Sequence, residues 1–158
     1  PLMKRITYWP QLFLGITFNY GLLLAWVSVS NDISLVSIAF YVGAIFWTLG
    51  YDTIYGFQDI KDDEIIGVKS TSIKFKKNPK IFIFLCYLFF FLILIYIGFL
   101  MKFNFIYFAG IILVGFHLFF YQSIKLNTND SKNCLERFKS NNFLGLLIFI
   151  IILITKII

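Results

Sequence analysis

"IFIFLCYLFFFLILIYIGFLM", residues 81–101, contains 21 consecutive residues without a charged side chain. About 20 apolar residues in helical form cross the hydrocarbon core of a bilayer. Within that core, only a helix or a closed barrel satisfies every backbone polar group. The stretch therefore predicts a transmembrane helix. Working outward from it, we expect five spans in all, at Gln11–Val29, Leu35–Gly56, Ile81–Met101, Phe105–Ile124 and Phe143–Ile157.

The composition supports a membrane protein. Hydrophobic residues make up 59% of the 158 residues and charged residues 14%, against roughly 25% charged residues in soluble domains. One apolar stretch alone is compatible with a buried helix of a soluble protein, but five in succession leave too little polar surface. We therefore expect an all-α transmembrane fold, with residues 1–158 forming a single membrane domain. Two long loops are expected, at Phe57–Lys80 and Lys125–Asn142.

The distribution of basic residues predicts the topology. Twelve of the 14 lysines and arginines fall in the segment before the first span and in the two long loops, leaving Lys102 and Lys156 for the other side. Because basic residues favour the cytoplasmic side, we expect these loops in the cytoplasm and the chain in a bacterial inner membrane. We attribute the net charge of +6 to the basic residues that set the topology and contact anionic lipids. No pattern in the sequence indicates nucleic-acid binding.

Most of the acidic residues lie in one stretch, "YDTIYGFQDIKDDEIIGVKSTSIKF", residues 51–75. At 100° per residue, a helix continued from the second span places Asp52, Asp59 and Asp63 within a stripe about 40° wide. Tyr55 lies about 60° from Asp52, while Glu64 points away from the stripe. Like charges on one helix face repel, and a carboxylate near an apolar span is costly. A solvated surface run explains Glu64 but not the stripe.

A cation that compensates for the stripe would explain it. Mg²⁺ takes one or two carboxylates and shares its remaining positions with water and substrate phosphates. Lys4, Arg5 and Lys69 are expected on the same side of the membrane and would pair with phosphate. A diphosphate site at the mouth of an apolar bundle indicates a lipid diphosphate, whose tail lies between the helices. Loss of diphosphate would leave an allylic cation that aromatic side chains stabilise. A structural salt-bridge cluster is the alternative.

The acidic stretch resembles the second aspartate-rich motif of the UbiA superfamily of membrane prenyltransferases, and most closely its 4-hydroxybenzoate polyprenyltransferase branch. "PLMKRITYWPQLFLG", residues 1–15, resembles the segment that enters the fifth helix of that family, with Lys4 at its lysine position. The tyrosine that precedes the proline in the family's pattern is not present. "NNFLGLLIF", residues 141–149, resembles the start of its last helix.

The resemblance implies a bundle of nine transmembrane helices in which two aspartate-rich motifs hold Mg²⁺ and a polyprenyl diphosphate. It assigns Asp59 and Asp63 as metal ligands and Asp52 as a further catalytic aspartate. Lys4 and Arg5 match residues near the diphosphate or the aromatic carboxylate, and Lys69 lies in the loop that caps the site. The implied reaction prenylates 4-hydroxybenzoate for ubiquinone synthesis.

The five spans match helices five to nine of the family, and the first motif, NDxxDxxxD, is absent from the sequence. We expect a truncated or split chain that is inactive alone and acts with a separate chain carrying the first four helices. Asn19, inside the first span, is expected either to line the substrate cavity or to join helices, and Tyr55 to contact a carboxylate or anchor at the interface. Three alternative functions remain: a prenyltransferase with a different aromatic acceptor, an ion-coupled transporter fragment and a non-catalytic remnant.

Overall fold

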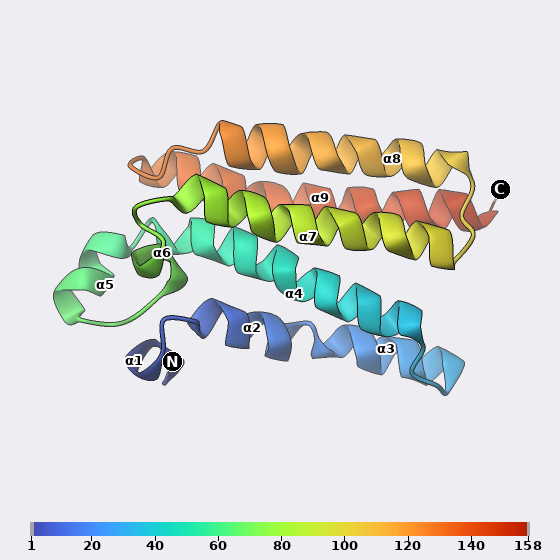
Figure 1. Cartoon of the computed structure of the whole chain (residues 1–158), viewed down its shortest axis with the longest axis horizontal. Helices are drawn as coiled ribbons and strands as arrows, with labels where there is room; N and C mark the ends of the chain where they lie inside the picture. The colour runs from blue at the N-terminus through green and yellow to red at the C-terminus, as the bar shows by residue number, and fades with distance from the viewer. Residues whose placement is uncertain (1, 158) are drawn as a thin grey trace.

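The computed structural model describes residues 2–157 and is helical, with the long helices side by side (Figure 1). Five helical stretches are long and apolar enough to cross a membrane, which confirms the predicted fold class. The elements are α1 (Met3–Ile6), α2 (Pro10–Phe18), α3 (Tyr20–Ser30), α4 (Leu35–Gly56), α5 (Ile60–Ile66), α6 (Thr71–Lys74), α7 (Pro79–Leu100), α8 (Phe105–Phe116), the π-helix η1 (His117–Ile124) and α9 (Ser131–Ile157).

Local sequence signals account for the helix ends. Ser34 and Ser37 form a reciprocal capping box at the start of α4, which satisfies two backbone N–H groups that the helix leaves free. Pro79 occupies the first turn of α7, where a missing N–H costs no hydrogen bond. Asn31 and Lys102 adopt positive φ angles of 55° and 52°. These two residues turn the chain at the short connections that precede α4 and α8.

Helix α4 lies at the centre of the bundle. It packs against α7, α2, α3 and α9. The contact with α7 is close because Gly50 has no side chain: a Cβ there would lie 2.6 Å from Cε1 of Tyr87. The Tyr87 ring, fully buried, fills that space.

The first span is interrupted at Asn19, where α2 gives way to α3. The side-chain Nδ2 of Asn19 donates to the carbonyl of Gly15 and to Oγ1 of Thr48 on α4, both at 2.8 Å. Asn19 therefore joins two helices, as one of the two sequence interpretations held. It also lines a pocket described below, and the other interpretation, that it lines a substrate cavity, stays a prediction.

The last helix begins earlier than the sequence indicated. Helix α9 starts at Ser131, so the prediction of a loop over residues 125–142 was wrong for residues 131–142. The charged residues Lys132, Glu136 and Lys139 of this part are exposed, while one helical stripe, which includes Arg137, is buried. The stripe repeats at alternating intervals of three and four residues: Cys134, Arg137, Asn141, Leu144, Ile148, Ile151 and Thr155. A search for apolar runs missed it because its first members include polar residues.

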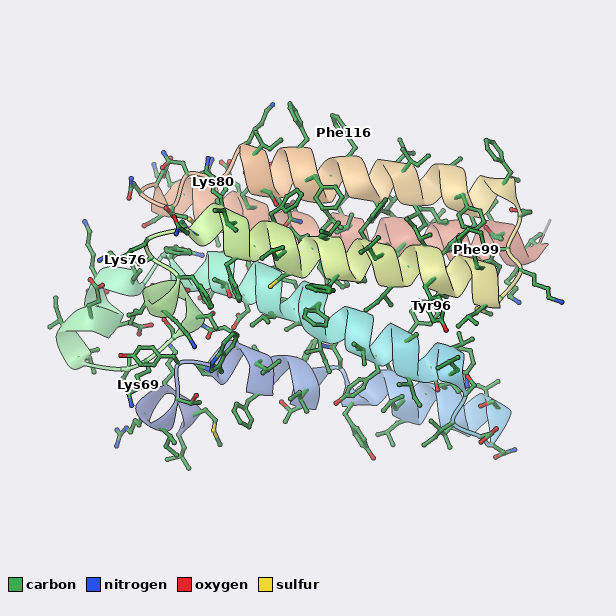
Figure 2. The ribbon with its side chains drawn as sticks, in the orientation of Figure 1. Lys69, Lys76, Lys80, Tyr96, Phe99 and Phe116 are labelled. Carbon is green, nitrogen blue, oxygen red and sulfur yellow. The ribbon has the colours of Figure 1, made fainter. Side chains whose placement is uncertain are left out.

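The basic segments gather at one end of the bundle, as predicted. Lys69, Lys76 and Lys80 lie at the end that carries α1, α5 and α6 (Figure 2). Tyr96 and Phe99, near the end of α7, mark the opposite end. Within the residues that the structure describes, both cysteines are unpaired and buried.

Candidate functional site at the acidic end of the bundle

The continuous acidic stripe predicted from the sequence was wrong. Helix α4 ends at Gly56, a turn follows, and a separate helix α5 begins at Ile60 with Asp59 as its N-cap residue. The extrapolation assumed a straight helix across this turn. Asp59 and Asp63 remain one turn apart, because the amide of Asp63 donates to the carbonyl of Asp59 at 2.8 Å. Asp52 lies on the other side of the break, on α4.

Asp63 forms an ion pair with Lys4, 59 positions away in sequence. Nζ of Lys4 donates to both carboxylate oxygens of Asp63, at 3.2 and 3.1 Å. The side chain of Asp63 is only 11% exposed and that of Lys4 is 43% exposed. Burial of a carboxylate is tolerated because the bidentate cation compensates for its charge. The structure thus brings together a predicted metal ligand and a predicted diphosphate-binding residue.

Lys69 joins the same cluster through backbone and side chain. Its amide donates to the carbonyl of Lys4 at 2.6 Å, and its Nζ donates to the carbonyl of Ile6 at 3.2 Å. Nζ also lies 5.6 Å from the centroid of the Tyr8 ring. The loop after α5 therefore packs against α1, and its role as the cap of the site stays a prediction.

The loop after α5 is held by hydrogen bonds that the sequence did not reveal. Oε1 of Gln11 on α2 accepts from the amide of Thr71 at 3.0 Å. The hydroxyls of Thr71 and Thr53 are 2.6 Å apart, and Oγ of Ser72 donates to the carbonyl of Thr53 at 2.8 Å. Ser70 caps α6 by accepting from the amide of Ile73. Thr71 and Ser72, in the "KSTS" part of the motif, thus hold this segment against α4 and α2.

Three other acids of the motif are exposed to solvent. Asp59 and Asp62 are exposed, and Glu64 pairs with Lys76, with Nζ at 2.7 and 2.9 Å from its oxygens. Such exposed pairs contribute at most about 1 kcal/mol. Glu64 is therefore a surface residue, as the sequence indicated.

Asp52 and Lys4 line a pocket of about 430 Å³ between α1, α2 and α4. A second pocket, of about 440 Å³, lies beside Tyr51, the residue before Asp52. We call it the amide-lined pocket, because three asparagines contribute to its wall. Its lining is Phe18, Asn19, Trp47, Thr48, Tyr51, Phe138, Asn141, Asn142, Gly145 and Leu146.

Two further predicted substrate-binding residues are exposed and line neither pocket. Arg5 is exposed on α1. Tyr55 is 39% exposed, and its ring packs against Phe138 at a centroid distance of 4.7 Å.

The carboxylates fit part of a magnesium site. Among residues 2–157, no group of three or more His, Cys, Asp or Glu side chains lies close enough to hold a metal ion. Asp59 and Asp63 on consecutive turns supply two carboxylates, which is the number that Mg²⁺ takes when substrate phosphates and water complete its shell. The donor set of this chain therefore suits one side of a metal–diphosphate site.

Five membrane-spanning stretches and a cluster of acids and lysines at one end define a polytopic α-helical membrane protein with a polar site at the bundle mouth. A model of the UbiA prenyltransferase family matches residues 1–151. The chain belongs to this family.

Curated relatives are similar over nearly the whole chain. The mitochondrial 4-hydroxybenzoate polyprenyltransferase of Bos taurus is 42% identical over 95% of this chain and 40% of its own length. The mitochondrial protein of the same name from Homo sapiens is 40% identical over the same shares. The 4-hydroxybenzoate octaprenyltransferase of Psychromonas ingrahamii is 38% identical over 94% of this chain and 52% of its own length. The chain thus spans about two fifths to one half of these relatives. No solved structure matches it significantly.

Proposed function

We propose that this chain is part of an enzyme that transfers a polyprenyl group from its diphosphate to 4-hydroxybenzoate, with Mg²⁺ as cofactor, in ubiquinone synthesis. The observation that carries the proposal is the cluster of Lys4, Asp63 and Lys69 at the mouth of the bundle. It lies beside a pocket that Asp52 and Lys4 line. The names of the relatives supply the two substrates.

The charges suit a diphosphate head group. Lys4 and Lys69 provide two cations for phosphate oxygens, and Asp59 and Asp63 provide carboxylates for a divalent ion. When bound, Mg²⁺ neutralises charge that develops on the departing diphosphate. Lys4 has a donor group that can turn from Asp63 to phosphate, because its side chain is 43% exposed. Arg5 adds a third exposed cation on the same short helix.

The bundle offers an apolar path for the prenyl tail. Further along the bundle from the amide-lined pocket, a third cavity of about 650 Å³ lies between α3, α4 and α9. Leu22, Trp26, Phe40, Phe149 and Ile152 contribute to its wall. A tail laid along these cavities would place the reacting carbon near Trp47 and Tyr51, whose faces favour a cation.

The main alternative is an ion-coupled transporter fragment. Transporters place their coupling groups near the bilayer midplane, on broken helices. The broken span here carries Asn19 at its break, and the acids lie at the end of the bundle instead. A naphthoate or another aromatic acceptor is a second alternative, and the assay below separates the acceptors by which of them the enzyme prenylates.

We further propose that the chain works with the four helices and the NDxxDxxxD motif that the family carries ahead of the matched region. Two carboxylates on one side leave most waters on Mg²⁺, so the diphosphate would lack a fixed orientation. The basic end is proposed to face the cytoplasm of a bacterium with the bundle in its inner membrane, following the distribution of lysines.

The test is prenyl transfer in membranes of a bacterial host that lacks its own enzyme. The 158-residue chain is produced alone and together with a chain carrying the first four helices, and Mg²⁺-dependent prenylation of 4-hydroxybenzoate is measured. We expect activity only in the pair. Asp59→Asn and Asp63→Asn should each lower it by about 100-fold or more, since misplacing a reacting group by 1 Å can cost that much. Asp62→Asn, on the exposed side of α5, is the matched control.

Three results would contradict the proposal. One is full activity of the chain alone. Another is equal activity in all three carboxamide variants. The third is a functional pair that prenylates other acceptors but never 4-hydroxybenzoate.

A further inference from the structure

A buried polar network links four elements of the bundle behind the amide-lined pocket. Nε1 of Trp47 on α4 donates to Oδ1 of Asn141 on α9 at 2.8 Å. Nε2 of Gln122 on η1 donates to the same oxygen at 2.9 Å. The hydroxyl of Tyr87 on α7 donates to Oε1 of Gln122. Gln122 and Tyr87 are fully buried, and Asn141 is 7% exposed.

The donors and acceptors of this network fix the orientation of both amides. The indole N–H of Trp47 can only donate, so Oδ1 of Asn141 faces it, and Gln122 must present Nε2 to that same oxygen. Oδ1 of Asn141 then accepts two N–H groups, while its Nδ2 donates to the carbonyls of Arg137 and Phe138 at 3.1 and 3.0 Å. A buried network with every member satisfied holds one arrangement of its side chains.

The π-helix brings Gln122 into this network. In η1 the backbone is wider than an α-helix, and Oγ of Ser123 bonds the carbonyl five residues earlier, that of Leu118, at 3.1 Å. Gln122 and Ser123 are consecutive and both buried. A π-helical segment is uncommon and often lies at a functional site, and here it supplies the amide that faces Asn141.

Trp47 is held on three sides. Its indole stacks on Phe90 with a centroid distance of 5.3 Å and an interplanar angle of 2°. Its ring meets Tyr51 nearly at a right angle, at 5.8 Å. Its N–H is fixed by Asn141. The remaining surface of the indole lines the amide-lined pocket.

We propose that Gln122 and Asn141 are positioning residues that hold the indole of Trp47 in the one orientation in which it meets the prenyl cation or the aromatic acceptor. The inference rests on the proposed function. The attraction between an aromatic ring and a cation is directed at the ring face, so a rotated indole loses it. Gln122 does not line the pocket, and its effect on the reaction must pass through Asn141 and Trp47.

The test uses the chain paired with the first four helices, in a background where Trp9 and Trp26 are replaced by Phe. Trp47 is then the only tryptophan of this chain, and selective ¹⁵N labelling of its indole reports the N–H hydrogen bond directly. Asn141→Leu removes the side chain that contacts Trp47. Gln122→Leu removes the side chain behind it, which contacts Asn141. Asn141→Asp keeps the acceptor oxygen, and Ser140→Ala is the control on the same helix.

We expect both leucine variants to shift the indole N–H resonance of Trp47. They should also lower kcat by about 10-fold, the scale of one aromatic–cation contact, with KM for 4-hydroxybenzoate changed by less than about 3-fold. Asn141→Asp, which keeps the acceptor oxygen for Trp47 but loses the Nδ2 donor, should change both properties less than Asn141→Leu, and Ser140→Ala should change neither.

An unchanged indole resonance in both leucine variants would overturn the inference. So would a shifted resonance with unchanged kcat. If the parent pair transfers no prenyl group, the proposed function fails, and the indole resonance still decides whether Gln122 and Asn141 hold Trp47.

Discussion

Removing either partner of the Lys4–Asp63 ion pair should loosen the N-terminal segment without unfolding the bundle. Two unit charges 3.1 Å apart attract by about 5 kcal/mol at an effective dielectric constant of about 20. The hydration free energy that the two charged groups lose offsets most of this attraction. Exposed pairs retain about 0.2–1 kcal/mol, and removing one partner of a buried pair costs about 3–5 kcal/mol. With Asp63 11% and Lys4 43% exposed, we expect about 1.5 kcal/mol.

The loss of stability should appear as local opening of the N-terminal segment, because α1 has only four residues. The amide of Lys69 donates to the carbonyl of Lys4 at 2.6 Å, so its hydrogen exchange reports whether α1 and the loop after α5 stay together. A loss of about 1.5 kcal/mol corresponds to roughly 10-fold faster exchange. The assay is hydrogen exchange by mass spectrometry on peptides that cover residues 68–71, for the chain in nanodiscs.

Lys4→Met and Asp63→Asn should each produce this acceleration, and the double variant should add little to either single variant. Lys76→Met is the control, because it breaks the exposed pair with Glu64 and leaves the contact between Lys69 and Lys4 intact. Unchanged exchange in both single variants would refute the pairing, as would fully additive effects in the double variant.

Two further predictions concern packing and topology. Gly50→Ala should lower the free energy of unfolding by about 1–3 kcal/mol in denaturant titrations, because its Cβ would meet Tyr87, whereas Gly21→Ala, with open space around it, should not destabilise. In intact cells, Lys102→Cys should react with an impermeant maleimide and Lys74→Cys should not; the reverse pattern would contradict the proposed orientation.

The membrane spans were predictable because their signal is local. Residues 35–56 carry one charge, at Asp52, and the helix ends where the sequence indicated. Two local predictions were wrong. The acidic stripe was drawn by continuing helical angles past Gly56 without tertiary information, although the span itself was predicted to end there. The first turns of α9 were missed because a helix with charged residues on one face resembles a loop in a search for apolar runs.

The candidate site was predictable in its residues but not in its contacts. The acids and lysines were identified from their clustering and from the family resemblance, yet nothing in the sequence pairs Lys4 with Asp63. The buried network was missed entirely. Gln122 and Asn141 are 19 residues apart on different helices, and each alone resembles an ordinary polar residue near the end of a span.

Helix α4 connects the two polar regions. Trp47 and Tyr51 line the amide-lined pocket, and Asp52, one residue on, lines the pocket that contains Lys4. Tyr87 fixes this helix in two ways: its ring fills the space beside Gly50, and its hydroxyl binds Gln122. A change at Tyr87 would therefore shift the position of α4 and the orientation of Trp47 together. If the diphosphate binds at Asp52 and the acceptor beside Trp47, the separation between the two substrates is set by about one turn of a rigid helix. Tyr87, which touches neither pocket, is then among the residues that control it.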